Sequence, residues 1–226
     1  MIDTIDNFEY EVVKVGRVLT KYLGNDAQVT IPSDVAIIGE NAFSRNATIK
    51  TLDLSHTKDV MIKKRAFSDC TALESIVFSP GFYVFVGEYA FADCTALRQL
   101  DMTRSNCAAF TFAFSGCIAL TEVRLQQCQY LLDGAFADCS ALRTVELGAT
   151  KKLGRGVFRN CVSLTEIYLP NLEEVADSVF TGCTALCHIR CAQKKGMFSD
   201  CPHGWDKDWA KGLPSTAKIK WGIKRN

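Results

Sequence analysis

The sequence holds little of what catalysis or membrane insertion usually requires. It contains only three histidines and no Gly-x-Ser-x-Gly segment, so few pairs of nucleophile and base are available. Gly154-Arg155-Gly156 is too short for a dinucleotide fingerprint. No apolar run approaches the roughly 20 residues that span a bilayer. With 48% hydrophobic and 23% charged residues, the composition is that of a folded globular chain. These absences predict a non-enzymatic protein without a cofactor or a membrane span.

A secretory signal is also missing from the N-terminus. Residues 1–6 are acidic and lack the basic and apolar regions of such a signal, which predicts a cytoplasmic protein, with the cell surface or secretion as the alternative. The net charge of +1 is unevenly spread, because residues 190–226 carry nine Lys/Arg against three Asp/Glu. This basic stretch contains Trp205, Trp209 and Trp221, which raises nucleic-acid binding as a third functional hypothesis. We favour the simpler interpretation that these tryptophans cover a core.

One pattern recurs seven times along the chain. A small residue precedes a phenylalanine, and the phenylalanines follow one another at steps of 22 to 24 residues. They are Phe43, Phe67, Phe91, Phe114, Phe136, Phe158 and Phe180. In six copies a cysteine follows three residues later, and in every copy Leu or Ile follows six residues later. Two further apolar positions lie nine and eleven residues after the phenylalanine, as in Ile76 and Phe78.

The spacing within each copy predicts its structure. Steps of three suit a tight turn or short helical segment with one face inward, and a step of two is strand alternation. Neither half can bury its apolar face alone, so successive copies must stack around a shared core. The sequence therefore predicts one α/β solenoid domain, 1–226, of about seven turns with one parallel strand per turn. Its repeats would occupy 42–191, between an N-terminal cap at 1–41 and a C-terminal cap at 192–226.

Both caps have recognisable strand patterns. Residues 10–15 and 18–23 flank Gly16-Arg17 as a predicted hairpin, and a strand is expected to begin at Val29. Residues 192–226 lose the repeat, and 218–221 are predicted to form a last strand. These segments would cover the core and the strand edges that a solenoid leaves open at its ends.

Six of the eleven cysteines follow the repeat, and we predict that the cysteines are reduced thiols rather than a disulfide framework. These six share one phase of the repeat, which predicts a stacked ladder of buried, reduced thiols. A zinc site was considered because one group of residues has plausible ligand spacing. This group comprises Cys183, Cys187, His188, Cys191, Cys201 and His203. Since Cys183 and Cys191 already occupy inward repeat positions, we predict no metal site.

The repeat resembles the BspA-type leucine-rich repeat. The resemblance rests on the small-Phe-x-x-Cys-x-x-Leu pattern with its following strand, and on the entry segment from Val29 through Phe43. It covers residues 18 to 191 approximately. It implies a right-handed leucine-rich-repeat superhelix and a role in adhesion or protein–protein contact, with no catalytic motif to transfer. The asparagine of the more familiar leucine-rich repeats is absent, since its positions hold residues such as Thr57, Ser105 and Thr150.

The predicted binding surface is the outward face of the strands. Because residues nine and eleven after each phenylalanine face inward, those at eight and ten face outward. The proposed contact residues are Asp53, Val77, Asp101, Arg124, Glu146, Tyr168 and Arg190 in one column and Gln99, Glu122, Glu166 and His188 in the other. Arg124, Tyr168 and Arg190 are expected to act as anchors, since Arg and Tyr are typical hot-spot residues.

The preferred function is therefore a monomeric scaffold or adaptor that binds an unidentified protein partner through this face and adjacent loops. The alternative is a surface or secreted adhesin. The strip of outward residues measures only about 340 Å², against roughly 800 Å² per partner in a standard interface. Flanking loops or a cap must therefore join it.

Overall fold

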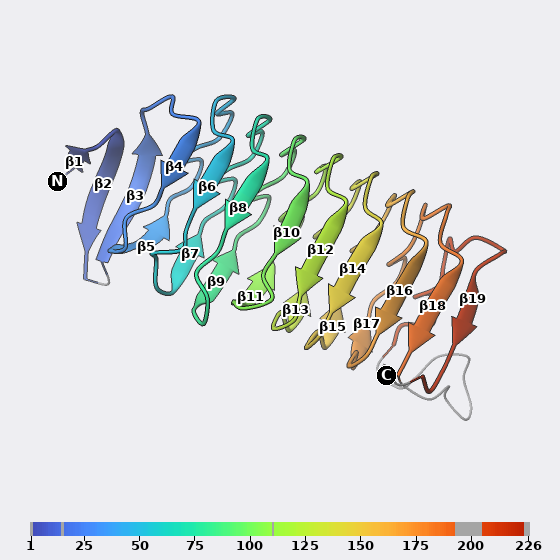
Figure 1. Cartoon of the computed structure of the whole chain (residues 1–226). Coiled ribbons are helices and arrows are strands. Elements are labelled where there is room, and N and C mark those ends of the chain that lie inside the picture. The colour runs from blue at the N-terminus through green and yellow to red at the C-terminus, as the bar shows by residue number, and fades with distance from the viewer. Residues whose placement is uncertain (1, 15, 110, 193–204, 224–226) are drawn as a thin grey trace.

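The chain forms a rod of stacked coils, each contributing strands to the two sides of the rod (Figure 1). The computed structural model describes residues 2–14, 16–109, 111–192 and 205–223. One side carries the strands β4 (Gln28–Thr30), β6 (Thr51–Asp53), β8 (Ser75–Val77), β10 (Gln99–Asp101), β12 (Glu122–Leu125), β14 (Thr144–Leu147), β16 (Glu166–Leu169), β18 (His188–Cys191) and β19 (Lys218–Lys220). These strands pair in parallel as a three-stranded sheet, β4-β6-β8, followed by a six-stranded sheet from β10 to β19.

A second, ten-stranded sheet forms the other side of the rod. Its strands are β1 (Ile2–Ile5), β2 (Phe8–Val13), β3 (Gly16–Tyr22), β5 (Val35–Ile38), β7 (Val60–Ile62), β9 (Tyr83–Val86), β11 (Asn106–Ala109), β13 (Tyr130–Leu131), β15 (Lys152–Leu153) and β17 (Glu174–Val175). A parallel strand per turn was predicted, and the parallel strands from β4 to β18 confirm it. The second strand in each turn was not predicted.

The solenoid has about eight turns, where about seven were predicted. The additional turn begins at β4, inside the segment assigned to the N-terminal cap. Val29 pairs with Leu52 and both are buried, so Val29 stands where later turns have their first inward strand residue. Counting phenylalanines missed this turn because no small-Phe-x-x-Cys segment precedes β4.

The predicted helical part of the α/β fold is wrong, because the segment around each phenylalanine is a succession of turns and no helix occurs in the described ranges. The cause is a residue with positive φ two positions before and two positions after each phenylalanine. In the second repeat these are Arg65 at 53° and Asp69 at 58°. Left-handed residues every fourth position interrupt a right-handed helix.

The turns are held by two alternating sets of backbone hydrogen bonds. The amide of Cys70 donates to the carbonyl of Phe67 within its own turn, at 3.3 Å. The amide of Phe67 donates instead to the carbonyl of Ala90 in the next turn, at 2.7 Å. Some backbone groups of each turn therefore form hydrogen bonds within that turn, and others form them with the next turn. These segments are thus linked along the rod by hydrogen bonds, as the strands are.

Both caps contain the expected strands. The N-terminal hairpin is confirmed as β2 and β3, with Val13 opposite Gly16, so its turn lies slightly earlier than predicted. An unpredicted strand, β1, pairs with β2 through a turn at Asp6-Asn7, whose positive φ values suit a tight hairpin. The last strand is confirmed as β19.

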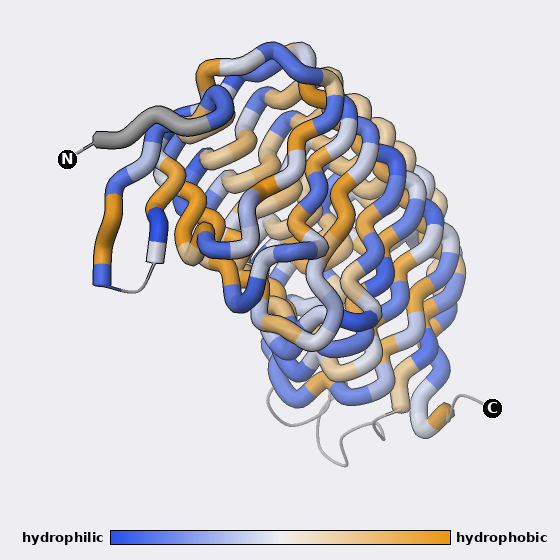
Figure 2. Tube along the Cα trace, turned by 60° about the vertical axis from the view of Figure 1, so that its left-hand side comes forward, coloured by the Kyte–Doolittle hydropathy of each residue, from blue (hydrophilic) through white to orange (hydrophobic). Residues whose placement is uncertain are grey.

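The core is a stack of side chains that runs along the whole rod. The seven repeat phenylalanines lie over one another with centroid separations between 4.5 Å and 6.0 Å. Tyr22 extends the stack toward the N-terminus, and Trp209 meets Phe180 edge-on at the other end. Figure 2 shows the coils behind one another, with hydrophobic and hydrophilic stretches alternating along each coil. Repetition of one apolar pattern therefore produces one continuous interior.

Candidate functional site

The two predicted outward columns are brought into register on the strand face, which we define as the outward side of β4 to β19. Asp101, Arg124 and Glu146 lie side by side on β10, β12 and β14. Glu146 pairs with Tyr168, and Tyr168 with Arg190. In the same column, toward the N-terminus, Asp53 pairs with Val77. In the other column, Gln99 pairs with Glu122, and Glu166 pairs with His188. All eleven predicted residues are partly or fully exposed.

The three expected anchors contact neighbours on their own face. Arg124 forms an ion pair with Glu122 at 2.7 Å, and Arg190 pairs with Glu166 at 3.1 Å. The hydroxyl of Tyr168 donates to the carbonyl of Ile223 at 3.1 Å, where the C-terminal segment returns over the face. These contacts hold the side chains in place, which lowers the conformational entropy that a bound partner would have to remove.

A groove of about 770 Å³ lies on the strand face over β14 and β16. Its lining includes the predicted residues Glu146, Glu166, Tyr168 and Arg190, so part of the predicted set meets in one place. It also includes Thr144, which lies in the second outward column between Glu122 and Glu166, and three residues that the sequence did not single out, namely Arg143, Thr165 and Ile223. Arg143 and Thr165 precede their strands at matching repeat positions, whereas no repeat pattern could place Ile223, which belongs to the cap.

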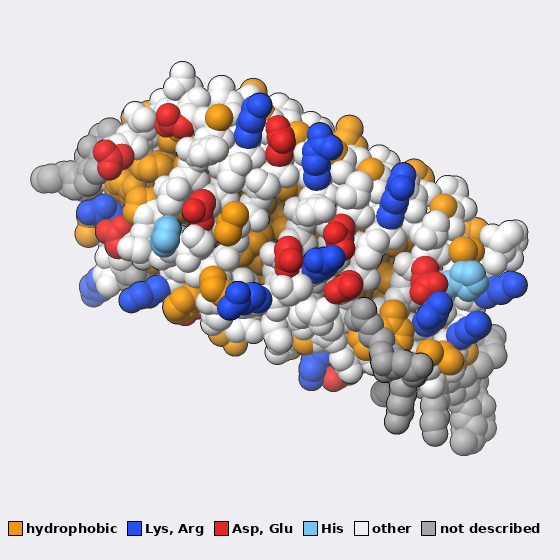
Figure 3. All heavy atoms as spheres, viewed as in Figure 1, with side chains coloured by type: hydrophobic (Ala, Val, Ile, Leu, Met, Phe, Trp, Pro, Cys, Tyr) orange, Lys and Arg blue, Asp and Glu red, His pale blue; other side chains and the backbone are white. Residues whose placement is uncertain are grey.

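Charge is unevenly distributed along the strand face (Figure 3). Asp53 and Asp101 lie in its N-terminal half, while the pairing of β18 with β19 sets His188 beside Lys218 and Arg190 beside Lys220. The right-hand end of the face in Figure 3 accordingly shows basic side chains gathered together. A partner that spans the face would need the opposite arrangement of charge.

The cysteine ladder is buried, as expected, and each of its thiols is hydrogen-bonded. Each Sγ donates to the carbonyl of the phenylalanine in the preceding turn, as Cys183 does to Phe158 at 2.9 Å. Burial raises the pKa of Cys70 and Cys117 to about 12. The thiolate is the reactive form, so these cysteines are inert structural residues.

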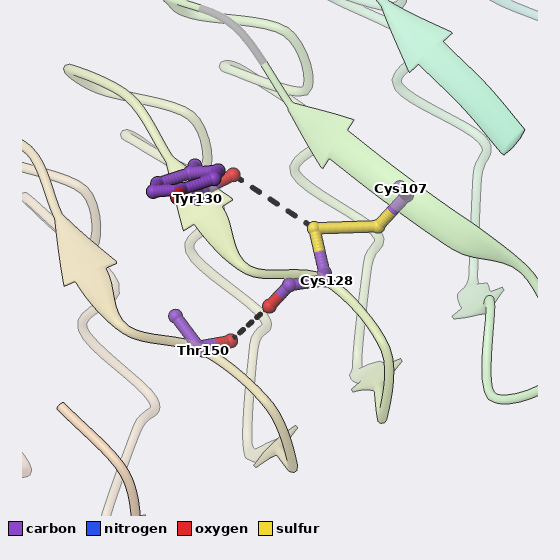
Figure 4. Close-up of a disulfide and its surroundings, with 4 residues drawn as sticks. All are labelled: Cys107, Cys128, Tyr130 and Thr150. Carbon is purple, nitrogen blue, oxygen red and sulfur yellow. Dashed lines mark hydrogen bonds between the residues drawn. A yellow bond between two sulfur atoms is a disulfide. The ribbon is translucent and has the colours of Figure 1, made fainter.

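The expectation that all cysteines are reduced is wrong for one pair. Cys107 of β11 and Cys128, which precedes β13, form a disulfide between successive turns (Figure 4). Their Cα atoms are 4.6 Å apart, because neighbouring turns stack closely and both side chains point into the same gap. The carbonyl of Cys128 also accepts the hydroxyl of Thr150 at 2.7 Å. Neither cysteine belongs to the six-membered ladder, which is why its phase did not reveal them.

The considered zinc residues divide between two environments. Cys183 and Cys191 are fully buried in the core, whereas Cys187 is partly exposed and lies 3.2 Å from Nδ1 of His188. Cys201 and His203 lie outside the described residues. In the described ranges no group of three or more metal-binding side chains is found, and no helix is long and apolar enough to cross a membrane.

The three tryptophans form the C-terminal cap. Trp205 and Trp209 are buried with ring centroids 4.9 Å apart, and Trp221 packs against both. The buried rings of Trp205 and Trp209 cannot at the same time present their faces to nucleic-acid bases. The structure therefore favours the capping interpretation of these residues over base stacking.

Comparisons with known proteins agree with this architecture. The family described as "BspA type Leucine rich repeat region (6 copies)" matches residues 20–106 and 60–187. The leucine-rich-repeat protein of T. pallidum is 24% identical over 83% of this chain and 80% of its own, with a TM-score of 0.54. A Bacteroides ovatus leucine-rich-repeat protein is 21% identical over 97% of this chain and 67% of its own, with a TM-score of 0.49.

A leucine-rich cell surface protein from Faecalibacterium prausnitzii is 16% identical over 100% of this chain and 96% of its own, with a TM-score of 0.42. Among curated proteins, none matches. The family match spans well over half of the sequence and agrees with the stacked turns, the phenylalanine core and the cysteine ladder. The chain belongs to the BspA-type leucine-rich-repeat family.

Proposed function

We propose that this protein is a non-enzymatic scaffold that binds a protein partner across the strand face. The supporting observation is the groove over β14 and β16, where Arg143, Tyr168 and Arg190 meet beside the returning C-terminal segment. Inward strand positions are uniformly apolar, but outward positions differ in size and charge from turn to turn. This combination gives a rigid support for a chemically varied surface.

The groove also offers the additional area that a strip of strand residues lacks. Its walls come from the residues before the strands and from Ile223 of the cap, so a partner seated there would contact strands, a loop edge and the C-terminal segment together. Arg and Tyr residues at such a position favour protein contact, because they combine large area with directed hydrogen bonds. In this proposal the predicted residues Asp53, Val77 and Asp101 extend the surface toward the N-terminus.

The proposal is tested by filling the groove. Thr144→Arg places a long cationic side chain on β14, in the lining of the groove, at an exposed position. Thr71→Arg, at an exposed position in a turn outside the groove, is the matched control. Affinity purification from native extract, read by quantitative mass spectrometry, should show partners that wild type and Thr71→Arg retain and that Thr144→Arg loses at least about tenfold, or about 1.4 kcal/mol. Equal recovery with all three baits would contradict a binding site in the groove.

A further inference from the structure

The outward side of the ten-stranded sheet carries an apolar column of side chains, a feature that the strand face lacks. Strand pairing aligns its members on six successive strands: Val18, Ile37, Met61, Phe85, Ala108 and Tyr130. Phe85 is 39% exposed and Tyr130 47%, and Tyr83 beside Phe85 is 52% exposed. Beyond Tyr130 the column turns polar at Lys152 and Glu174, which form an ion pair. Contiguous apolar patches on soluble proteins mark sites of interaction.

A shallow hollow of about 200 Å³ lies in the apolar column between β7 and β9. Met61, Phe85 and Gly87 line it, and Gly87 allows the backbones of the two turns to pack closely, since a Cβ there would come within 2.6 Å of the carbonyl oxygen of Ile62. Lys64 and Glu88 line it too and form an ion pair at 2.8 Å. Lys63 lines the hollow as well and is exposed. The hollow therefore combines an apolar surface with two positive groups beside β7 and one negative group beside β9.

We propose that a second copy of this chain occupies the apolar column, with a two-fold axis that runs along the strands between β7 and β9. The reason is that the column is complementary to itself about this line. A rotation of 180° about this axis places Met61 of one copy over Phe85 of the other. It also places each end of one column over the opposite end of the other column. The same rotation places Lys64 opposite Glu88, twice, so that these two side chains each find a partner across the interface, while Lys63 stays outside this charge match. A two-fold interface requires this kind of reciprocal match.

The size of the column sets the strength of the dimer. Six strands about 4.8 Å apart span roughly 24 Å, and a height of about five residues, which counts the residues on either side of the column, gives roughly 16 Å, or about 400 Å² per copy. The total of about 800 Å² is below the 1,200–2,000 Å² or so of stable complexes, so self-association is weak and reversible. The strand face belongs to a different sheet and stays accessible in the dimer. Loss of self-association and loss of the proposed partner binding are therefore separate outcomes.

Sedimentation velocity gives the first test. The wild-type chain of 25.0 kDa should shift toward twice that mass as its concentration rises, over a range of roughly 10 μM to 1 mM that suits a weak interface. Phe85→Asp should remain monomeric over the same range. Val162→Asp is the matched control, because Val162 is an exposed apolar residue in a turn outside the ten-stranded sheet, and it should associate like the wild type. A wild type that stays monomeric at about 1 mM overturns the proposal and leaves the apolar column to a different partner.

A charge exchange gives the second test. Lys64→Glu puts two carboxylates opposite each other in a dimer, and Glu88→Lys puts two ammonium groups opposite each other, so each variant alone should associate at least about tenfold more weakly. In an equimolar mixture, the Lys64→Glu chain meets the Glu88→Lys chain with opposite charges at both contacts, and a mixed dimer should form. Circular dichroism verifies that both variants fold. A mixture that associates no better than either variant alone refutes the proposed axis.

Discussion

The thiols of the cysteine ladder are neutral at the pH of most experiments because their environment excludes charge. Cys117 is fully buried and donates to the carbonyl of Phe91 at 3.3 Å. Burial raises its pKa to about 12, whereas a thiol in an unfolded chain ionises near 8.5 or so. Below the unfolded value both states hold the proton, and the stabilising contribution is complete. Between the two values only the unfolded state ionises, and the contribution is lost as pH rises.

We therefore expect the free energy of unfolding to fall between pH 8.5 and 12 or so, by up to about 1.4 kcal/mol per pH unit for each buried thiol. Cys117→Ala removes one such thiol and should decline less steeply with pH than the wild type by this amount. Urea unfolding under reducing conditions at several pH values between roughly 9 and 10.5 measures both slopes. Parallel slopes would mean that Cys117 does not titrate differently in the two states.

At the scale of the elements, buried hydroxyl groups stand at three of the seven positions where the more familiar leucine-rich repeats have asparagine. Thr57 donates to the carbonyl of Leu54 at 2.8 Å, and Ser105 to that of Ser79 at 2.7 Å. Thr150, in the loop between β14 and β15, donates to the carbonyl of Cys128 in the preceding turn at 2.7 Å. These residues satisfy loop carbonyls that the stacking of turns has removed from water.

Thr150→Val should test this role, because it keeps the shape of the side chain and removes the donor. The carbonyl of Cys128 would then be left without the hydroxyl of Thr150, at a cost of about 1–3 kcal/mol. Chemical denaturation measures the change. The exposed Thr71→Val is the control and should cost much less. Similar stabilities for the two variants would show that the bond of Thr150 contributes nothing net.

The repeat predicted most of these elements, because side chains that face the core must recur. It located the strands from β6 to β18 and the cysteine ladder, while the hairpin and β19 followed from strand patterns in the caps. The strands of the second sheet were missed although they have a signal, an apolar pair such as Val84 and Val86 shortly before each phenylalanine. In later turns this pair shrinks to one buried residue, such as Leu131 or Leu153, and the alternation disappears.

The candidate surface was predictable only in part. The alternation along each strand correctly predicted which residues face outward. The packing that turns every second residue inward also fixes the orientation of the residues between them. The groove could not be predicted, because Ile223 forms part of its lining. The contact of Ile223 with Tyr168 depends on how the cap folds back over the strands and not on the repeat. The disulfide likewise joins cysteines at different phases of two turns, so only the stacking distance brings them together.

At the scale of the whole molecule, the C-terminal cap terminates the phenylalanine stack. Trp209 is buried and meets Phe180 at 6.4 Å and Trp205 at 4.9 Å. Trp209→Ala should therefore expose the end of the stack and cost about 3–5 kcal/mol, as large-to-small core substitutions do. Thermal unfolding followed by circular dichroism measures the effect. Ile223→Ala, at a partly exposed position of the same cap, should cost far less, and equal losses would contradict a special capping role for Trp209.

The left-handed residues on either side of each phenylalanine make every turn geometrically equivalent to the next. From Phe67 to Phe180 each turn presents the same ring, thiol and carbonyl to its neighbours, so the junction between two of these turns is independent of their position in the rod. A turn can then be duplicated or lost as a whole without creating an unfamiliar junction, provided that both ends keep their caps. The number of turns, and with it the length of the exposed surface, can therefore change by duplication or loss of whole repeats while the structure of each turn stays the same.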